Sequence, residues 1–247
     1  VVVVVDDDEE QRVGGGSGPG IETGAPPPAA AVPNPPPTAL EQIRTVEYAL
    51  LCAWFSIALV PLQYYVAILG YRMEELGDAE GRYADLFAYV FAGAAVTAPL
   101  AGYLADEHGL GVAQGLASLT VSLPFALLAL GEHLPLRWQV AGLVAYGIGR
   151  MSVFGLFFTN CGTRFGYRNY GTLAGLGLLV SALVSLLQYP LLRWTVRGRA
   201  AATVNALCAA FLVVPTAPYA AWLHRREVSG TGSGDGDGDD DGKPREP

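Results

Sequence analysis

Cysteine and histidine are scarce in this chain, whose 247 residues contain three of each. Cys52, Cys161 and Cys208 stand singly in apolar segments, a spacing that fits neither a disulfide framework nor a zinc site. We therefore expect small buried thiols and no metal centre. A basic stripe is also missing, so binding to nucleic acid is not expected.

Acidic charge is concentrated near the two ends of the chain. The net charge of −8 comes largely from residues 6–10 and 235–241. These residues belong to segments 1–43 and 226–247, which are rich in Gly, Pro or polar residues and are therefore predicted to be disordered. The first residue is Val and no basic segment follows it, so we expect a piece of a longer protein and no signal peptide.

Long apolar runs fill the region between these two segments. Six runs occupy about 49–70, 84–104, 110–131, 138–161, 171–192 and 200–223. Each has about 21–24 residues, enough for a helix rising about 1.5 Å per residue to cross a hydrocarbon layer of about 30 Å. No run shows the alternation of a membrane barrel strand. The sequence therefore predicts an all-α membrane protein with six transmembrane helices.

The six runs repeat as two sets of three. The first three begin near 49, 84 and 110, and the next three begin near 138, 171 and 200, an offset of about 87–90 residues. Transporter halves built from three-plus-three inverted repeats have this arrangement. We expect such a six-helix bundle over residues 44–225.

Arg150 is the one full charge deep inside an apolar run. A central Arg costs about 2.5–3.5 kcal/mol on the insertion scale, and its apolar neighbours return roughly 3–5 kcal/mol, so the helix can still insert. Such an Arg normally faces the bundle interior or a water-filled cavity. Two interpretations remain open. Arg150 either holds a substrate carboxylate or couples to gating, or it hydrogen-bonds backbone carbonyls or a helix end to lock two spans together.

Acidic residues and histidines are absent from the interior of the runs. An intramembrane hydrolase would need them as a general base or as metal ligands. We therefore expect no enzyme, no catalytic residues and no cofactor.

The segment between the second and third runs carries a recognisable loop motif. Gly102, Asp106 and Gly109 match the G-x-x-x-D-x-x-G pattern, although Glu107 and Leu110 stand where basic residues are usual. The segment resembles the loop signature of the major facilitator superfamily. The resemblance implies that this loop is cytoplasmic and that both termini are cytoplasmic as well.

A longer stretch begins in the loop after the fourth run. Residues 165–176 read F-G-x-x-x-x-G-x-L-x-G-L, and residues 181–190 read S-A-x-x-S-L-L-Q-x-P. This stretch is similar to solute carrier family 43, the large neutral amino acid transporters of that superfamily. The resemblance makes residues 45–225 spans seven to twelve of a twelve-span transporter, and the acidic segment 1–43 part of its central cytoplasmic loop.

The resemblance implies a facilitative transporter of a small organic solute, a neutral amino acid, working by alternating access in the plasma membrane or an endomembrane. Its partners would be membrane lipid, the small-molecule substrate and the missing N-terminal six-span half. The substrate site would lie between the halves, with Gln63, Tyr64, Arg150 and Phe154 in the wall that this half supplies. The alternative is a non-transporting six-span scaffold or partner subunit derived from a transporter.

Overall fold

A computed structural model describes residues 37–198 and 200–231. The predicted disorder of residues 1–36 and 232–247 lies outside the described residues. Within those ranges every regular element is a helix. The expected all-α fold class is confirmed.

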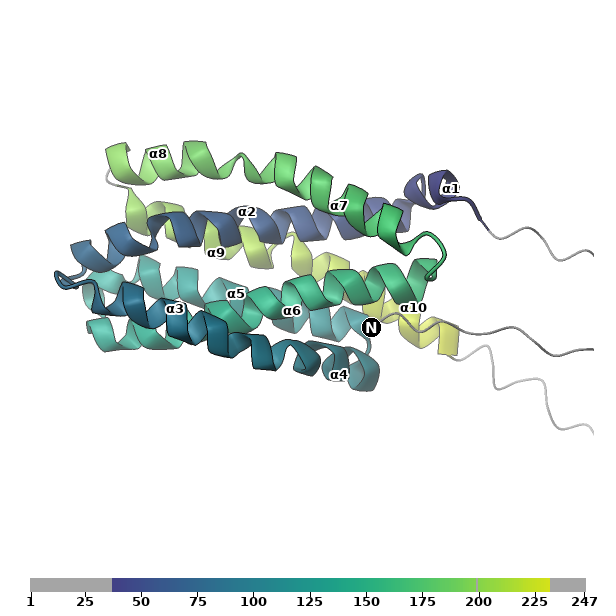
Figure 1. Cartoon of the computed structure of the whole chain (residues 1–247), viewed down its shortest axis with the longest axis horizontal. Coiled ribbons are helices and arrows are strands. Elements are labelled where there is room, and N and C mark those ends of the chain that lie inside the picture. The colour runs from purple at the N-terminus through teal and green to yellow at the C-terminus, as the bar shows by residue number, and fades with distance from the viewer. Residues whose placement is uncertain (1–36, 199, 232–247) are drawn as a thin grey trace, which may run out of the picture. The chain divides into compact units, whose positions relative to one another are not determined.

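Six helical segments are long and apolar enough to cross a membrane, as predicted. Three of them are interrupted, so that two helices make up one span (Figure 1). In chain order the spans are α2 (Val46–Glu75); α3 (Arg82–Ala94) with the 3₁₀ turn η1 (Ala95–Thr97) and α4 (Ala98–His108); α5 (Leu110–Ala129); α6 (Gln139–Phe165), preceded by η2 (Gly131–His133) and η3 (Leu136–Trp138); α7 (Tyr170–Ser185) with α8 (Gln188–Gly198); and α9 (Ala201–Val213) with α10 (Thr216–Thr231).

Two boundaries differ from the prediction. Helix α1 (Ala39–Ile43) lies inside the segment 1–43 that was expected to be disordered. Helix α10 continues to Thr231, past the expected boundary at residue 225. A capping box accounts for α1, because Thr38 and Glu41 each accept a hydrogen bond from the other's backbone N–H.

Contacts between α1 and the loop after α6 fix the segment that precedes the first span. Gln42 is buried, and its Nε2 donates to the Phe165 carbonyl at 2.7 Å. Asn169 Nδ2 donates to Gln42 Oε1 at 2.9 Å and to the Pro37 carbonyl at 3.1 Å. The Phe165–Asn169 part of the transporter-like stretch therefore clamps the chain just before the first span.

The packing of the spans follows the expected three-plus-three repeat. The second span packs on the fourth through α3, α4 and α6, and the fifth packs on the first through α7, α8 and α2. Likewise α5 packs on α6, and α9 packs on α2, while α5 and α9 pack on each other. Exchanging the first three spans for the last three leaves this set of neighbours unchanged, which supports an inverted repeat.

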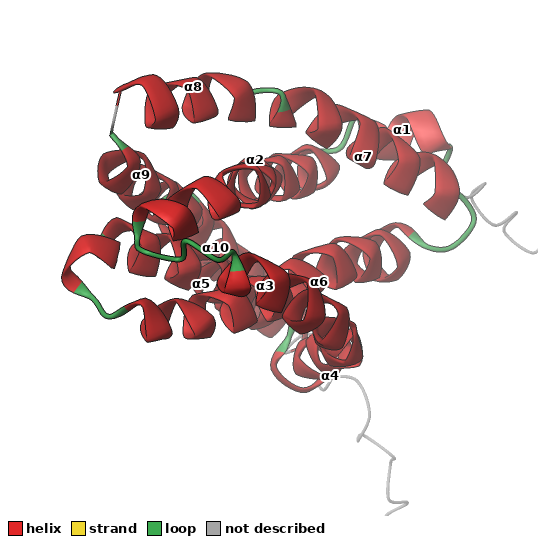
Figure 2. Ribbon diagram, turned by 60° about the vertical axis from the view of Figure 1, so that its left-hand side comes forward, coloured by secondary structure: helices red, strands yellow, loops and turns green. Residues whose placement is uncertain are grey.

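The second and fifth spans, which are equivalent in the repeat, are both interrupted. The second span changes to a 3₁₀ turn at η1, and the fifth breaks at Leu186 and Leu187, where Figure 2 shows a green turn between α7 and α8. The start of the first span and the end of the last span lie on the same side of the bundle, since Arg226 of α10 forms an ion pair with Glu47 of α2. An even number of spans requires this.

Helix α2 is the centre of the bundle, and polar side chains tie it to the fifth span. Three hydrogen bonds do so: Tyr48 to the Leu173 carbonyl at 2.7 Å, Ser56 with Ser181 at 2.9 Å, and Tyr64 with Thr195 at 2.6 Å. The residue offset is 125 in the first two pairs and 131 in the third. The two helices therefore run parallel and in register as far as the break, after which the fifth span uses more residues than α2 over the same distance.

The extra length makes the fifth span bow away from α2. Two apolar hollows of about 520 and 420 Å³ lie between α2, α7–α8 and α9, and they share Val60, Leu187 and Phe211. Leu187 sits in the break itself. The hollows are the space beneath the bowed span.

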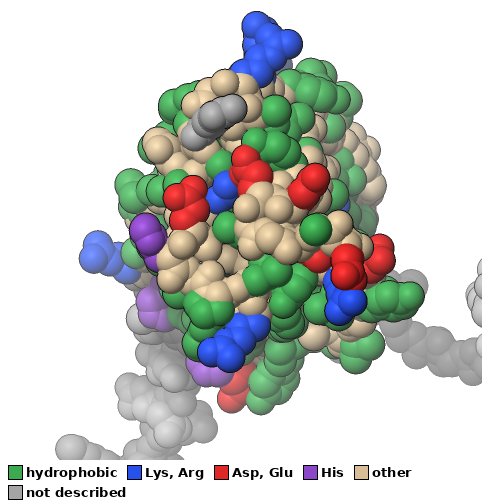
Figure 3. All heavy atoms as spheres, turned by 90° about the vertical axis from the view of Figure 1, so that its left-hand side faces the viewer, with side chains coloured by type: hydrophobic (Ala, Val, Ile, Leu, Met, Phe, Trp, Pro, Cys, Tyr) green, Lys and Arg blue, Asp and Glu red, His purple; other side chains and the backbone are tan. Residues whose placement is uncertain are grey.

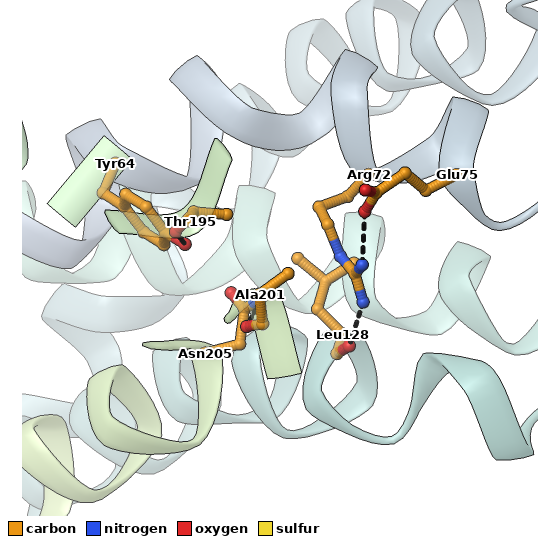
Figure 4. A network of polar contacts seen from close by, with 7 residues as sticks. All are labelled: Tyr64, Arg72, Glu75, Leu128, Thr195, Ala201 and Asn205. Atoms are coloured by element: carbon orange, nitrogen blue, oxygen red, sulfur yellow. Dashed lines mark hydrogen bonds and ion pairs between the residues drawn. The ribbon is translucent and has the colours of Figure 1, made fainter. Parts of the chain in front are cut away.

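Charged side chains gather at the end of the bundle where α2 meets α3, and hydrophobic side chains cover its flanks (Figure 3). Arg72 is an exception, because it is only 3 % exposed. It donates to Glu75 at 2.5 Å and to the Leu128 carbonyl of α5 at 3.2 Å (Figure 4). This carbonyl is at the C-terminal end of α5, where helix carbonyls lack intrahelical partners.

Asp78 shapes the turn between α2 and α3 and gives a first prediction. Its carboxylate accepts hydrogen bonds from the backbone N–H groups of Arg82 and Tyr83 at 2.9 and 2.8 Å. We expect Asp78→Ala to lower the free energy of unfolding by about 1 kcal/mol, the usual effect of losing a side-chain cap. Thermal unfolding in detergent measures this. Asp85→Ala removes an exposed carboxylate from the first turn of α3 and should have a smaller effect. Equal effects of the two substitutions would show that Asp78 does not cap α3.

The clamp on α1 gives a second prediction. A helix of five residues is too short to be stable alone, so α1 depends on its contacts with the loop after α6. Gln42→Ala should speed hydrogen exchange of the α1 amides, measured by mass spectrometry. Arg44→Ala changes an exposed neighbour and serves as the control. Unchanged exchange in Gln42→Ala would show that the clamp does not hold α1.

Candidate functional site

Arg150 lies near the middle of α6, on a half-buried face. Its Nη1 donates to the Tyr146 hydroxyl at 2.8 Å. The guanidinium carbon is 5.5 Å from the centre of the Phe91 ring and 5.6 Å from that of Phe154. No carboxylate in the described part of the chain forms an ion pair with it. Since charges interact strongly where the dielectric constant is low, this cation is suited to attract an anion.

Aromatic rings surround this position and connect α6 to α2 and α3. Tyr146 is fully buried and stacks on Tyr65 of α2, with ring centres 4.5 Å apart. Phe87 and Phe91 of α3 pack against Tyr146 at 5.5 and 6.3 Å. Phe91, together with Phe154, supplies the cation–π contacts that help to keep Arg150 in the span.

The two interpretations of Arg150 require different hydrogen-bond partners for its guanidinium. The contact that joins α6 to α2 at this level is made by Tyr146, whose hydroxyl donates to the Leu62 carbonyl at 2.8 Å. Arg150 bonds to the phenol and not to a backbone carbonyl. The geometry thus favours the interpretation in which the guanidinium serves a ligand, because another residue already joins the spans.

Phe154 and Gln63, both expected in the wall of the site, lie near this junction. Phe154 touches Arg150 and packs edge-on against Phe55 of α2 at 5.2 Å. Gln63 follows Leu62 in the chain, is half-buried, and shares its face of α2 with exposed Ala67 and Gly70. The structure therefore brings Arg150 and Phe154 into contact and places Gln63 on the open side of α2.

Tyr64 is not brought to Arg150. Its side chain is fully buried, and its hydroxyl is hydrogen-bonded to Thr195 of α8 (Figure 4). The next residue, Tyr65, is the one that stacks on Tyr146. One residue along a helix turns a side chain by about 100°, which is enough to move it from one neighbouring span to another.

The loop motif lies at the junction of α4 and α5. Gly109 has φ 85°, a conformation that strongly favours glycine, and it ends α4 and precedes α5. Asp106 is exposed in the last turn of α4. A Cβ at Gly102 would meet no atom within 4 Å, so nothing within the described bundle requires glycine there. The structure explains Gly109 and leaves Gly102 and Asp106 facing outward.

Sequence reasoning missed two residues of this site, Tyr146 and Phe91. Tyr146 could have been found, because residues four apart on a helix are neighbours and Tyr146 precedes Arg150 by four. Phe91 reaches Arg150 from another span, and no local pattern predicts that contact. Among residues 37–198 and 200–231, no group of three or more His, Cys, Asp or Glu side chains could hold a metal ion.

Comparison with known proteins gives one match. No curated protein matches the chain, and neither does any solved structure. A sequence profile described as Major Facilitator Superfamily matches residues 3–189, which is most of the chain and includes Arg150 and the loop motif. With six membrane-spanning helices in a repeated arrangement, the chain belongs to the Major Facilitator Superfamily of membrane transporters.

Proposed function

We propose that this chain is part of a facilitative transporter for a small organic solute that carries a carboxylate, and that Arg150 binds this carboxylate. One observation supports the proposal most directly. A guanidinium lies in the middle of a span, held by a phenol and two aromatic rings, and pairs with no carboxylate among the described residues. Such intramembrane cations are commonly functional.

A neutral amino acid is the proposed substrate. The similarity of residues 165–190 to solute carrier family 43 supports it, and Phe154 beside Arg150 offers an apolar surface to the substrate side chain. Gln63 on the open side of α2 is the proposed polar contact. Tyr64 is not included among the proposed substrate contacts, since its hydroxyl is hydrogen-bonded to Thr195.

The proposed assembly is a twelve-span transporter in the plasma membrane or an endomembrane, in which these six spans pair with six further spans. Both ends of the described bundle lie on one side, proposed as cytoplasmic from the loop that contains Gly102, Asp106 and Gly109. A non-transporting scaffold or partner subunit is the alternative, and no observation favours it.

Replacing Arg150 tests the proposal. In cells that express the full-length protein carrying this bundle, we expect Arg150→Gln to raise the apparent KM for radiolabelled leucine by more than about tenfold, because losing one partner of a buried charged pair costs about 2–5 kcal/mol. Arg150→Lys keeps the charge but loses the planar fork, so an intermediate KM is expected.

The matched control is Arg197→Gln, which removes an exposed charge at the end of α8. Surface labelling should show equal amounts of each variant in the membrane. Leucine uptake unchanged by Arg150→Gln, at equal surface amounts, would refute a role for Arg150 in binding. No uptake of leucine or other neutral amino acids by the unaltered protein would refute the proposed substrate.

A further inference from the structure

The hydroxyl of Tyr146 joins two groups that the proposed function treats separately, the anion-binding cation and the backbone of α2. It lies 2.8 Å from Arg150 Nη1 and 2.8 Å from the Leu62 carbonyl oxygen. The Tyr146 side chain is fully buried, so these two contacts fix the hydroxyl in the protein rather than in water.

The direction of the two hydrogen bonds follows from their chemistry. A phenol has one proton, and a carbonyl oxygen can only accept, so the proton of Tyr146 points to Leu62. Toward Arg150 the phenol oxygen can then act only as an acceptor. A guanidinium only donates, so Arg150 is a matching partner for the phenol oxygen.

Packing keeps the phenol in this position. Its ring is stacked on Tyr65 with an angle of 16° between the planes, and Phe87 covers another side. On Arg150 the contact with Tyr146 uses one of the five N–H donors of the guanidinium. The remaining donors are enough for a bidentate bond to a carboxylate.

We propose that Tyr146 is a positioning residue, which holds the guanidinium of Arg150 for the solute carboxylate and at the same time ties α6 to α2 through Leu62. The proposal rests on the proposed function of Arg150. It predicts that the phenol hydroxyl, and not the ring alone, sets how well the solute binds.

Tyr146→Phe removes the hydroxyl and keeps the ring. We expect the apparent KM for leucine to rise about tenfold, the effect of losing one hydrogen bond to a charged group, with the maximal rate within about twofold of the unaltered protein. Tyr65→Phe is a closely matched control. Tyr65 stacks on Tyr146 and is equally buried, but its hydroxyl has no hydrogen-bond partner among the described residues. It should leave KM unchanged.

A second readout does not depend on transport. Phenylglyoxal modifies arginine side chains, and mass spectrometry of the purified protein reports the rate at Arg150. Releasing the guanidinium from Tyr146 should raise this rate several-fold in Tyr146→Phe and leave it unchanged in Tyr65→Phe. Phe91→Leu, which removes one ring contact and no hydrogen bond, should raise it too, and it replaces Tyr146→Phe if that variant fails to reach the membrane.

The outcomes separate the two proposals. Higher KM and faster modification in Tyr146→Phe, with both unchanged in Tyr65→Phe, support the positioning role. Faster modification without leucine uptake by any protein, the unaltered one included, supports the positioning of Arg150 and refutes the proposed substrate. Equal KM and equal modification rates in Tyr146→Phe and Tyr65→Phe, or a fall in maximal rate with KM unchanged, would overturn the positioning role.

Discussion

The requirement that polar groups find partners inside the bundle shapes this protein more than any other constraint. Lipid offers no hydrogen bonds, so polar side chains within a span are stabilised by bonding to another span or to their own backbone. Helix α2 meets this requirement on several sides. It bonds to the fifth span through Tyr48, Ser56 and Tyr64, to α5 through Arg72, and to α6 through the Leu62 carbonyl. These bonds position the third, fourth and fifth spans against α2.

Arg150 meets the same requirement in a different way. Its charge is offset by a phenol oxygen and two ring faces and not by a carboxylate. Cation–π contacts are worth about 2 kcal/mol or more when desolvated, which is close to the insertion cost of a central Arg. A carboxylate partner within the bundle would neutralise the cation. An aromatic surrounding keeps the charge in the span and leaves it available to a ligand.

The sequence predicts the spans and their repeat because both depend on composition along the chain. It also singles out Arg150, since one charge in an apolar run is visible without a structure. It could not predict that Tyr65 and not Tyr64 faces Tyr146, because that depends on how α2 is rotated against its neighbours. Helix α1 was missed although its Thr38–Glu41 capping box is a local signal, because a helix of five residues also needs tertiary partners. Its partners Phe165 and Asn169 are distant in the chain, and local composition does not reveal them.

The break between α7 and α8 affects how the protein fits its bilayer. The fifth span has 29 residues, more than the roughly 20 that a hydrocarbon layer of about 30 Å requires. The unbroken helix α2 has 30 residues, so these two neighbouring spans fit the same layer in different ways. The interrupted span takes up the excess length by bowing over Leu187, while α2 stays in register with α7. Between Ser181 and Thr195 the fifth span uses 14 residues where α2, between Ser56 and Tyr64, uses eight, so the break fits a longer segment into the thickness that its straight neighbour spans.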